Sequence, residues 1–125
     1  MRYQYYNPNP KKNNASDCVV RMLCALTGKS WVDCFLDVTE RAIEIGDMPS
    51  VNSVWMSLLR DMGFKRYVIP DTCPIDCYTI EDFCVDNPKG EYIIGTGTHV
   101  AYIKDGCLYD SWNSLNEVPI FFFRR

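Results

Sequence analysis

The sequence predicts an α+β protein in which N-terminal helices pack on a C-terminal antiparallel sheet. Before residue 63, apolar side chains recur at helical spacing in three separate segments. From Glu91 onward the pattern alternates as in strands, with Asp105-Gly106 placed as a hairpin turn. No internal repeat or low-complexity linker divides the 125 residues, so they are expected to form a single domain.

The N-terminal segment is predicted to be irregular. Residues 1–12 contain two Asn-Pro pairs and show little periodicity, which is typical of an extended arm. Three tyrosines are expected to hold this arm against the body of the protein: Tyr3, Tyr5 and Tyr6. The folded domain itself is predicted to cover residues 13–125.

The first helix is expected from about Cys18 to Leu26, with Gly28 as its stop. The second begins at a capping box made by Ser30 and Asp33 and ends before Gly46. Its apolar stripe is predicted to enter the core: Trp31, Cys34, Phe35, Val38 and Ala42.

A third helix follows Pro49-Ser50, and Gly63 favours a left-handed C-terminal cap there. The core is also expected to include Trp55.

The second half is expected to be mainly strands. Residues 64–70 have strand-like composition, and Thr79 with Asp82 predicts a capped short helix ending near Val85. The segment from Glu91 to Trp112 predicts two or three antiparallel strands, and EVPIFFF predicts a final strand. Its aromatic run Phe121–Phe123 is expected to lie in the core or in an oligomer contact, because alternation cannot place three consecutive side chains on one face.

Charge and composition exclude several classes of partner. A net charge of −3 and a pI near 5.0 provide no extended basic surface, so nucleic acid is not an expected partner. No apolar stretch approaches the roughly 20 residues of a membrane span, and no signal-peptide core is present, which predicts no membrane partner and a cytoplasmic location. Seven cysteines, an odd number, are expected to remain reduced in that compartment.

Cys18, His99 and Asp110 are the residues that best fit a reactive site. Cys18 falls in the first turn of a predicted helix, where free N–H groups and the helix dipole stabilise a thiolate. His99 is the only histidine, and Asp110 follows it by eleven positions across the predicted hairpin turn, so the hairpin would bring the two together. An acid that orients an imidazole facing a thiol is the arrangement of nucleophilic catalysis.

These residues resemble the papain-like cysteine peptidase superfamily, in which a cysteine on the first helix precedes a histidine on a strand. Asp110-Ser111-Trp112 is similar to that superfamily's Asn-Ser-Trp motif, with Asp in place of the usual Asn. Asp17-Cys18 resembles the double-glycine leader peptidases, although those carry Gly where this chain has Val19. The DCVVR and TGKSW segments are also similar to small papain-like proteins from bacteriophage genomes, which implies a viral protein in the host cytoplasm.

The resemblance implies a hydrolase that uses a triad. Cys18 is the expected nucleophile, His99 the general base and then acid, Asp110 the residue that orients it, and Trp112 a substrate-binding residue. Residues 5–17, directly before Cys18, contain no glutamine of the kind that this superfamily usually places there. The side-chain amide of Asn13 or Asn14, with the N–H of Cys18, is therefore the expected oxyanion hole.

The expected function is a cysteine peptidase or amidase acting on a peptide or protein substrate, without cofactor or metal. Acyl transfer and deamidation would use the same triad. A catalytically inactive papain-like protein, such as a phage factor that binds a host protein, is the alternative from a different class. A third possibility is a zinc-stabilised module with four thiolates as ligands: Cys73, Cys77, Cys84 and Cys107.

Overall fold

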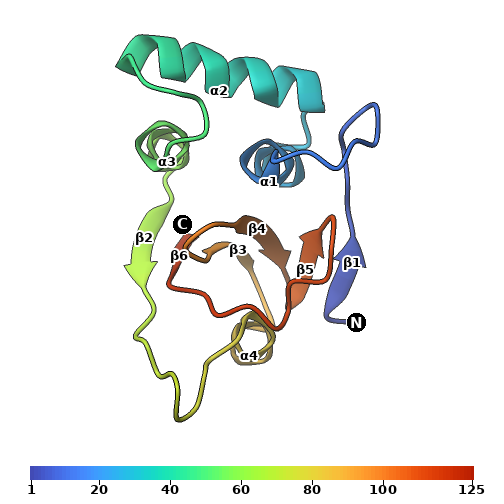
Figure 1. The fold of residues 1–125 in the computed structure, drawn as a ribbon, viewed down its shortest axis with the longest axis vertical. Helices are drawn as coiled ribbons and strands as arrows, with labels where there is room; N and C mark the ends of the chain where they lie inside the picture. The colour runs from blue at the N-terminus through green and yellow to red at the C-terminus, as the bar shows by residue number, and fades with distance from the viewer.

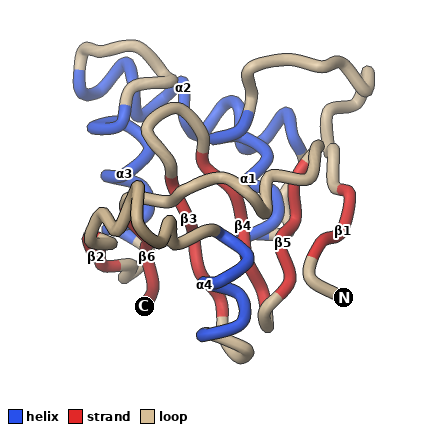
Figure 2. The backbone as a smooth tube through the Cα atoms, turned by 60° about the horizontal axis from the view of Figure 1, so that its bottom comes forward, coloured by secondary structure: helices blue, strands red, loops and turns tan.

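In the computed structural model, which describes residues 1–125, the chain forms a six-stranded mixed sheet with helices on both faces (Figure 1). The predicted α+β class is confirmed. The helices are α1 (Cys18–Thr27), α2 (Trp31–Ile45), α3 (Asn52–Asp61) and α4 (Ile80–Asp86). α1 and α3 lie between the sheet and α2, whereas α4 lies on the opposite face of the sheet (Figures 1 and 2).

The strands run in the order β1-β5-β4-β3-β6-β2 across the sheet. Their bounds are β1 (Tyr3–Tyr5), β2 (Lys65–Val68), β3 (Glu91–Gly95), β4 (Val100–Lys104), β5 (Cys107–Asp110) and β6 (Phe121–Arg124). The four pairs among β2 to β6 are antiparallel, as predicted, but β1 runs parallel to β5. The expectation of a wholly antiparallel sheet is therefore wrong at this edge.

The helices begin and end close to where capping chemistry predicts. Ser30 accepts a hydrogen bond from the N–H of Asp33 at the start of α2, and Gly28 ends α1 with a left-handed φ of 75°. Thr79 and Asp82 form the reciprocal capping box that begins α4. These predicted ends are confirmed.

Two separate apolar clusters cover the two faces of the sheet. Alternation along β3 sends Ile93 toward α1–α3 and Ile94 toward α4. The same alternation divides β6, where Phe121 and Phe123 join the first cluster and Phe122 packs against the second. The aromatic run is thus accounted for by the core, because both faces of the sheet are covered.

The N-terminal arm is not wholly irregular, which corrects the prediction for residues 1–12. Tyr3–Tyr5 forms the edge strand β1, and the N–H of Leu108 donates to the carbonyl of Arg2 at 2.7 Å. The N–H of Tyr6 donates to the carbonyl of Asp110 at 2.7 Å. The arm therefore holds the strand that ends at Asp110.

The cysteines also differ from expectation. Cys73 and Cys77 form a disulfide in the loop between β2 and α4, so the prediction that all seven thiols are free is wrong. The other five are free, and four of them are buried: Cys24, Cys34, Cys84 and Cys107. Cys18 is the free cysteine with partial exposure.

The stripe of α2 is buried only in part. Cys34, Val38 and Ala42 enter the core, but Phe35 is 45% exposed and stacks on the partly exposed Trp31 with ring centroids 5.2 Å apart. The prediction that all five enter the core is therefore wrong for Phe35, while Trp31 is partly buried and packs against the core cluster. α2 lies farther from the sheet than α1 and α3, so part of its apolar stripe remains exposed (Figure 1).

No helix combines the length and apolar character that a membrane span requires.

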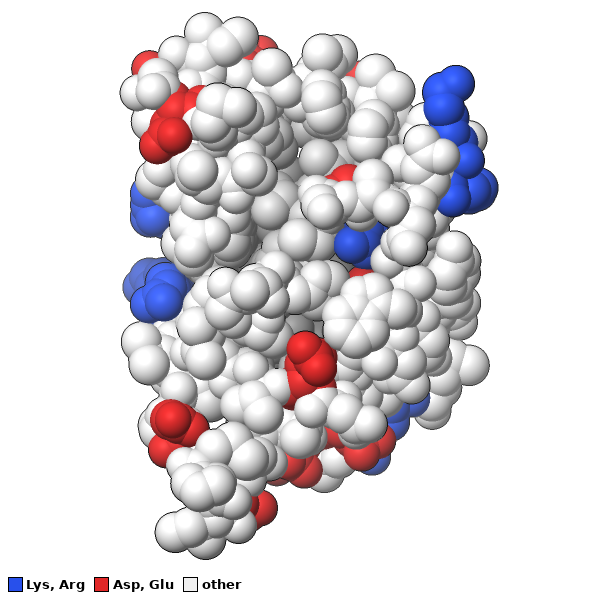
Figure 3. Space-filling view, viewed as in Figure 1, with Lys and Arg blue, Asp and Glu red and all other residues white.

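On the face shown in Figure 3, most of the surface is uncharged, and the lysine and arginine side chains lie mainly toward its margins.

Candidate active site

His99 and Asp110 meet at one end of the neighbouring strands β4 and β5. His99 directly precedes β4 and Asp110 is the last residue of β5. Because these strands are antiparallel and joined by a tight turn with positive φ at Asp105 and Gly106, the two positions lie side by side. His99 Nε2 lies 2.6 Å from Asp110 Oδ2.

Asp110 is a fixed carboxylate. Its side chain is only 1% exposed, and Oδ2 also accepts a hydrogen bond from Ser114 Oγ at 2.7 Å. Oδ1 accepts from its neighbour's backbone, the N–H of Ser111, at 2.8 Å and from Arg21 Nη1 at 2.9 Å. A carboxylate held by so many donors has one orientation, and it fixes the plane of the imidazole that it contacts.

Cys18 approaches the same imidazole from a different layer of the fold. It is the first residue of α1, and the pKa of its thiol depends on opposing influences. Burial raises that pKa. The side-chain contact with His99, the backbone N–H of Val100, and the charges of His99 and Arg21 outweigh burial, so the pKa of Cys18 lies below its ordinary value.

The pKa of His99 moves in the opposite direction. Burial lowers it, but the hydrogen bond to Asp110 and the contact with Cys18 raise the pKa of His99 to about 9. Since Asp110 occupies Nε2, Nδ1 is the ring nitrogen that remains for the sulfur. A lowered thiol pKa beside a raised imidazole pKa favours a thiolate–imidazolium pair at neutral pH.

Arg21 is a part of the site that sequence reasoning missed. Its guanidinium joins Asp110 through Nη1 and Asp17 through Nε, both at 2.9 Å, with side-chain exposure of 8%. Nη1 also donates to Ser111 Oγ at 2.8 Å, and Asp17 in turn accepts from Trp31 Nε1 at 2.9 Å. A chain of buried polar contacts thus runs from Trp31 to His99.

One feature of the sequence could have indicated this chain of contacts. Arg21 lies between the apolar residues Val20 and Met22 and four positions after Asp17, the spacing of a helical ion pair. An arginine is rarely buried without a partner, so a charged residue within an apolar run indicates a buried acid nearby. Asp17 occupies the N-cap position of α1 but makes no side-chain capping hydrogen bond there.

Trp112 covers the imidazole. Its ring lies 5.2 Å from the His99 ring, centroid to centroid, with an interplanar angle of 42°. The residue is 45% exposed, so the ring contacts His99 while part of its surface remains open to solvent. Its predicted role in substrate binding stays a prediction.

Asn13 and Asn14 are not placed beside Cys18. Both are exposed, and neither lines the cavities that Cys18 lines. Asn52 does line one of them, together with Cys18 and His99. Its Oδ1 accepts from Trp55 Nε1 at 3.1 Å, so its amide N–H₂ is the free end. Asn52 thus lines the cavity at Cys18, where Asn13 or Asn14 had been expected as part of the oxyanion hole.

Two cavities meet at Cys18. The first, about 240 Å³, contains His99, Asn52 and Thr98. The second, about 320 Å³, is bounded by Trp31, Phe35 and other residues of α2. Cys18, Val19, Ser50 and Thr98 line both cavities, so the sulfur lies where they join.

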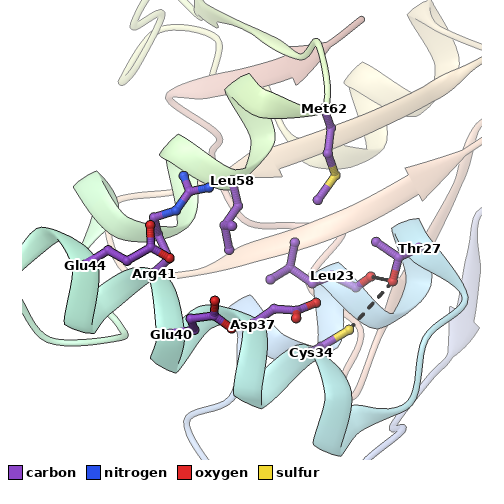
Figure 4. Close-up of a pocket in the computed structure, with 9 residues that line it drawn as sticks. All are labelled: Leu23, Thr27, Cys34, Asp37, Glu40, Arg41, Glu44, Leu58 and Met62. Carbon is purple, nitrogen blue, oxygen red and sulfur yellow. Dashed lines mark hydrogen bonds between the residues drawn. The ribbon is translucent and has the colours of Figure 1, made fainter.

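A further cavity lies away from these residues. It occupies about 210 Å³ among α1, α2 and α3 and is lined by residues such as Arg41, Glu44 and Met62 (Figure 4). In it Thr27 Oγ1 contacts Cys34 Sγ at 3.7 Å and donates to the Leu23 carbonyl at 2.7 Å. None of Cys18, His99 and Asp110 lines it, so it is separate from the candidate site.

The four cysteines considered as zinc ligands do not converge. Cys73 and Cys77 are bonded to each other, while Cys84 and Cys107 are buried thiols. No group of three or more histidine, cysteine, aspartate or glutamate side chains is arranged to hold a metal ion.

Comparisons of the chain with protein-family models, curated proteins and solved structures found no match. The chain is therefore described by its own fold and by the geometry of its candidate site. The chain is an α+β protein whose candidate site joins a cysteine at a helix start to a histidine–aspartate pair on a hairpin.

Proposed function

We propose that this protein is a thiol-dependent hydrolase that cleaves an amide bond, as a cysteine peptidase or amidase. The observation that carries the proposal is the convergence of three side chains: His99 Nε2 lies 2.6 Å from Asp110 Oδ2, and Cys18 at the start of α1 lines the same cavity as His99. The pKa of Cys18 is lowered and that of His99 is raised to about 9 by contacts that include each other. A thiol whose pKa is lowered, beside an imidazole whose pKa is raised, is prepared for acyl transfer.

The proposed reaction proceeds in two halves. The Cys18 thiolate attacks the carbonyl carbon of the amide, forming a C–S bond as the C=O π electrons move to oxygen. The oxyanion then collapses, the C–N bond breaks, and His99 gives its proton to the leaving amine. His99 next removes a proton from water, whose oxygen attacks the thioester, and the C–S bond breaks to release an acid and restore the thiolate.

Asp110 and Trp112 act on the imidazole in this scheme. Asp110 orients the ring and stabilises its positive charge through the 2.6 Å contact. Trp112 limits the access of water to His99, which strengthens that contact. The papain-like relationship stays a proposal that rests on the Asp110-Ser111-Trp112 motif and the Asp17-Cys18 pair in the sequence.

Asn52 and the backbone N–H of Cys18 are the proposed donors to the oxyanion. The free amide of Asn52 opens on the cavity that holds Cys18 and His99. Two donors of this kind stabilise the charge that develops on the carbonyl oxygen.

The first experiment measures alkylation of Cys18 by iodoacetamide between pH 6 and pH 8. An ordinary thiol, with a pKa of about 8.5, slows roughly 80-fold between pH 8 and pH 6. Cys18 should slow far less, because its thiolate persists, and His99→Ala should restore the steep dependence. The matched control is Cys18→Ser/Leu36→Cys, which places an ordinary thiol beyond the first turn of α2, where Leu36 is 55% exposed.

A second measurement separates an enzyme from a binding protein of the same fold. Incubation with p-nitrophenyl acetate should form a thioester on Cys18, detected by mass spectrometry, that then decays to free thiol. A thioester that persists would indicate reactivity without turnover and would favour the binding protein. If Cys18 alkylates with the same pH profile as the control thiol, the hydrolase proposal is wrong.

A further inference from the structure

Four free cysteines are buried, and two of them lie on either side of the turn between α1 and α2. Cys24 is three residues before the last residue of α1, and Cys34 is three residues after the first residue of α2. Only residues 28–30 connect the two helices, so the two cysteines occupy matching positions around one tight turn. Both thiols belong to the same apolar cluster, at 2% and 1% exposure.

The contacts of the two sulfurs show that they are neighbours. Cys34 Sγ lies 3.7 Å from Thr27 Oγ1, which donates to the carbonyl of Leu23 at 2.7 Å, so the sulfur lies against the turn of α1 that contains Cys24 (Figure 4). Burial, the charge of Cys34 and a side-chain contact with Cys34 together raise the pKa of the Cys24 thiol to about 12. Tyr6 borders both thiols, since burial and then the charges of Cys24 and Cys34 raise its pKa to about 12.

The other free thiols are not paired in this way. Cys84 lies in α4 and Cys107 in β5, and Cys107 acts on the pKa of Cys84 through its charge, without a side-chain contact. Cys18 contacts His99 and is six positions from Cys24 on α1, which is about 9 Å along the helix axis. Cys24 is therefore in side-chain contact with Cys34 but is far from the thiol of the candidate active site.

Cys34 can be reached from the surface. It lines the cavity of about 210 Å³ among α1, α2 and α3, whereas Cys24 does not (Figure 4). Glu40 and Glu44 are exposed and also line this cavity, so it opens to solvent. A water molecule occupies about 30 Å³ in the liquid, and hydrogen peroxide is little larger, so the cavity has room for it. A small oxidant would thus meet Cys34 before Cys24.

We propose that Cys24 and Cys34 are a redox-modification site, at which hydrogen peroxide produces a disulfide between α1 and α2. The Cys34 sulfur attacks a peroxide oxygen, an S–O bond forms as the O–O bond breaks, and the other oxygen leaves with the thiol proton as water. The Cys24 sulfur then attacks the Cys34 sulfur, the S–S bond forms as the S–O bond breaks, and the hydroxyl leaves with the Cys24 proton as a second water. The two thiols lose two electrons, and the peroxide gains them.

This site is independent of the chemistry proposed at Cys18, and its consequence is structural. The bond would join α1, the helix that begins with Cys18, to the outer helix α2. A cross-link that closes a loop of about ten residues restricts the unfolded chain and should lower the equilibrium constant of unfolding about 100-fold.

The test uses the full chain with serine at the reactive cysteine and at the disulfide-bonded pair: Cys18→Ser, Cys73→Ser and Cys77→Ser. After treatment with hydrogen peroxide, trypsin should release residues 22–29 and 30–41 as one linked species, lighter by two hydrogen atoms than the two free peptides together. Dithiothreitol should separate them again. Urea denaturation of the oxidised and reduced proteins should show the expected fall in the equilibrium constant of unfolding.

Variants assign the bond to the two helices. Cys34→Ser should abolish the link, whereas Cys84→Ser, which replaces a cysteine buried to the same degree in α4, should leave it intact. Should Cys34→Ser fail to fold, Cys34→Ala keeps an apolar side chain there and should abolish the link as well.

Three results would overturn the inference. In the first, peroxide leaves both thiols free or oxidises Cys34 to a sulfinic acid without a link. In the second, Cys84 and Cys107 form a disulfide as readily as Cys24 and Cys34, which would show that the side-chain contact does not select the pair. In the third, the linked protein unfolds at a lower urea concentration than the reduced protein, which would show that the fold does not hold the two sulfurs at bonding distance.

Discussion

Replacing Arg21 with methionine should destabilise the protein strongly. Methionine keeps much of the length and apolar contact of arginine but removes its charge and donors, leaving Asp17 without a cation and Asp110 with only His99. The three side chains are between 1% and 8% exposed, so water screens the loss poorly. Breaking a buried ion pair by removing one partner costs about 3–5 kcal/mol. Because Arg21 holds two acids, the upper part of that range is expected.

The assay is urea denaturation followed by tryptophan fluorescence, with the free energy of unfolding extrapolated to water. Arg41→Met is the matched control, since Arg41 pairs with Asp61 at the surface, where their side chains are 22% and 65% exposed. Such a surface pair contributes about 0–1 kcal/mol. The free energy of unfolding of a natural domain is only about 5–15 kcal/mol in total, so the destabilisation by Arg21→Met should be readily measured.

A second substitution tests whether the cost comes from the stranded carboxylate. Asp110→Asn in the Arg21→Met background replaces the uncompensated charge with an amide, so the double variant should be more stable than the sum of the two single changes implies. An Arg21→Met protein within 1 kcal/mol of the parent, or strictly additive changes, would refute the reasoning that Arg21 compensates Asp110.

Two other predictions concern His99 and Gly95. The His99 imidazole, followed by NMR, should titrate near pH 9, and Cys18→Ala should lower that pKa because it removes one of the contacts that raise it. Since the pKa of His99 in the folded protein lies above the ordinary 6.5, the stabilisation from His99 should be complete below pH 6.5 and lost as pH rises through 9. A titration midpoint at 6.5 would contradict the described contacts. Gly95→Ala should cost about 1–3 kcal/mol in the free energy of unfolding, because the added Cβ would lie 2.1 Å from Phe121 Cζ. Gly97→Ala should be nearly neutral, because a Cβ at that position would have no atom within 4 Å. Equal stability of the two variants would show that the Phe121 ring moves freely.

Local patterns were enough to predict most of the elements. The starts of α2 and α4 depend on side chains within three residues of the cap, and the turn between β4 and β5 on Asp105-Gly106. The proximity of His99 and Asp110 follows from that turn, so it too was accessible from the sequence. These features depend on neighbours in the chain.

The features that were missed depend on contacts between distant segments. β1 has three residues and exists because β5 offers a free edge, a condition that no local pattern records. Arg21 is buried because Asp110, 89 positions away, neutralises it. The exposure of Phe35 reflects the outer position of α2, and periodicity does not reveal which helix lies outermost.

The helix that carries Cys18 and the hairpin that carries His99 and Asp110 belong to different layers of the fold, and Arg21 joins the two layers through Asp110 and Ser111. Arg21 lies one turn along α1 from Cys18, so its ion pair with Asp110 fixes the position of α1 relative to the sheet. A slide of α1 that withdrew the sulfur from the imidazole would also have to pull a buried guanidinium away from its carboxylate. Displacement of the helix therefore costs a buried ion pair as well as the contact at the sulfur, so the same arginine that neutralises Asp110 also fixes the position of Cys18 relative to His99.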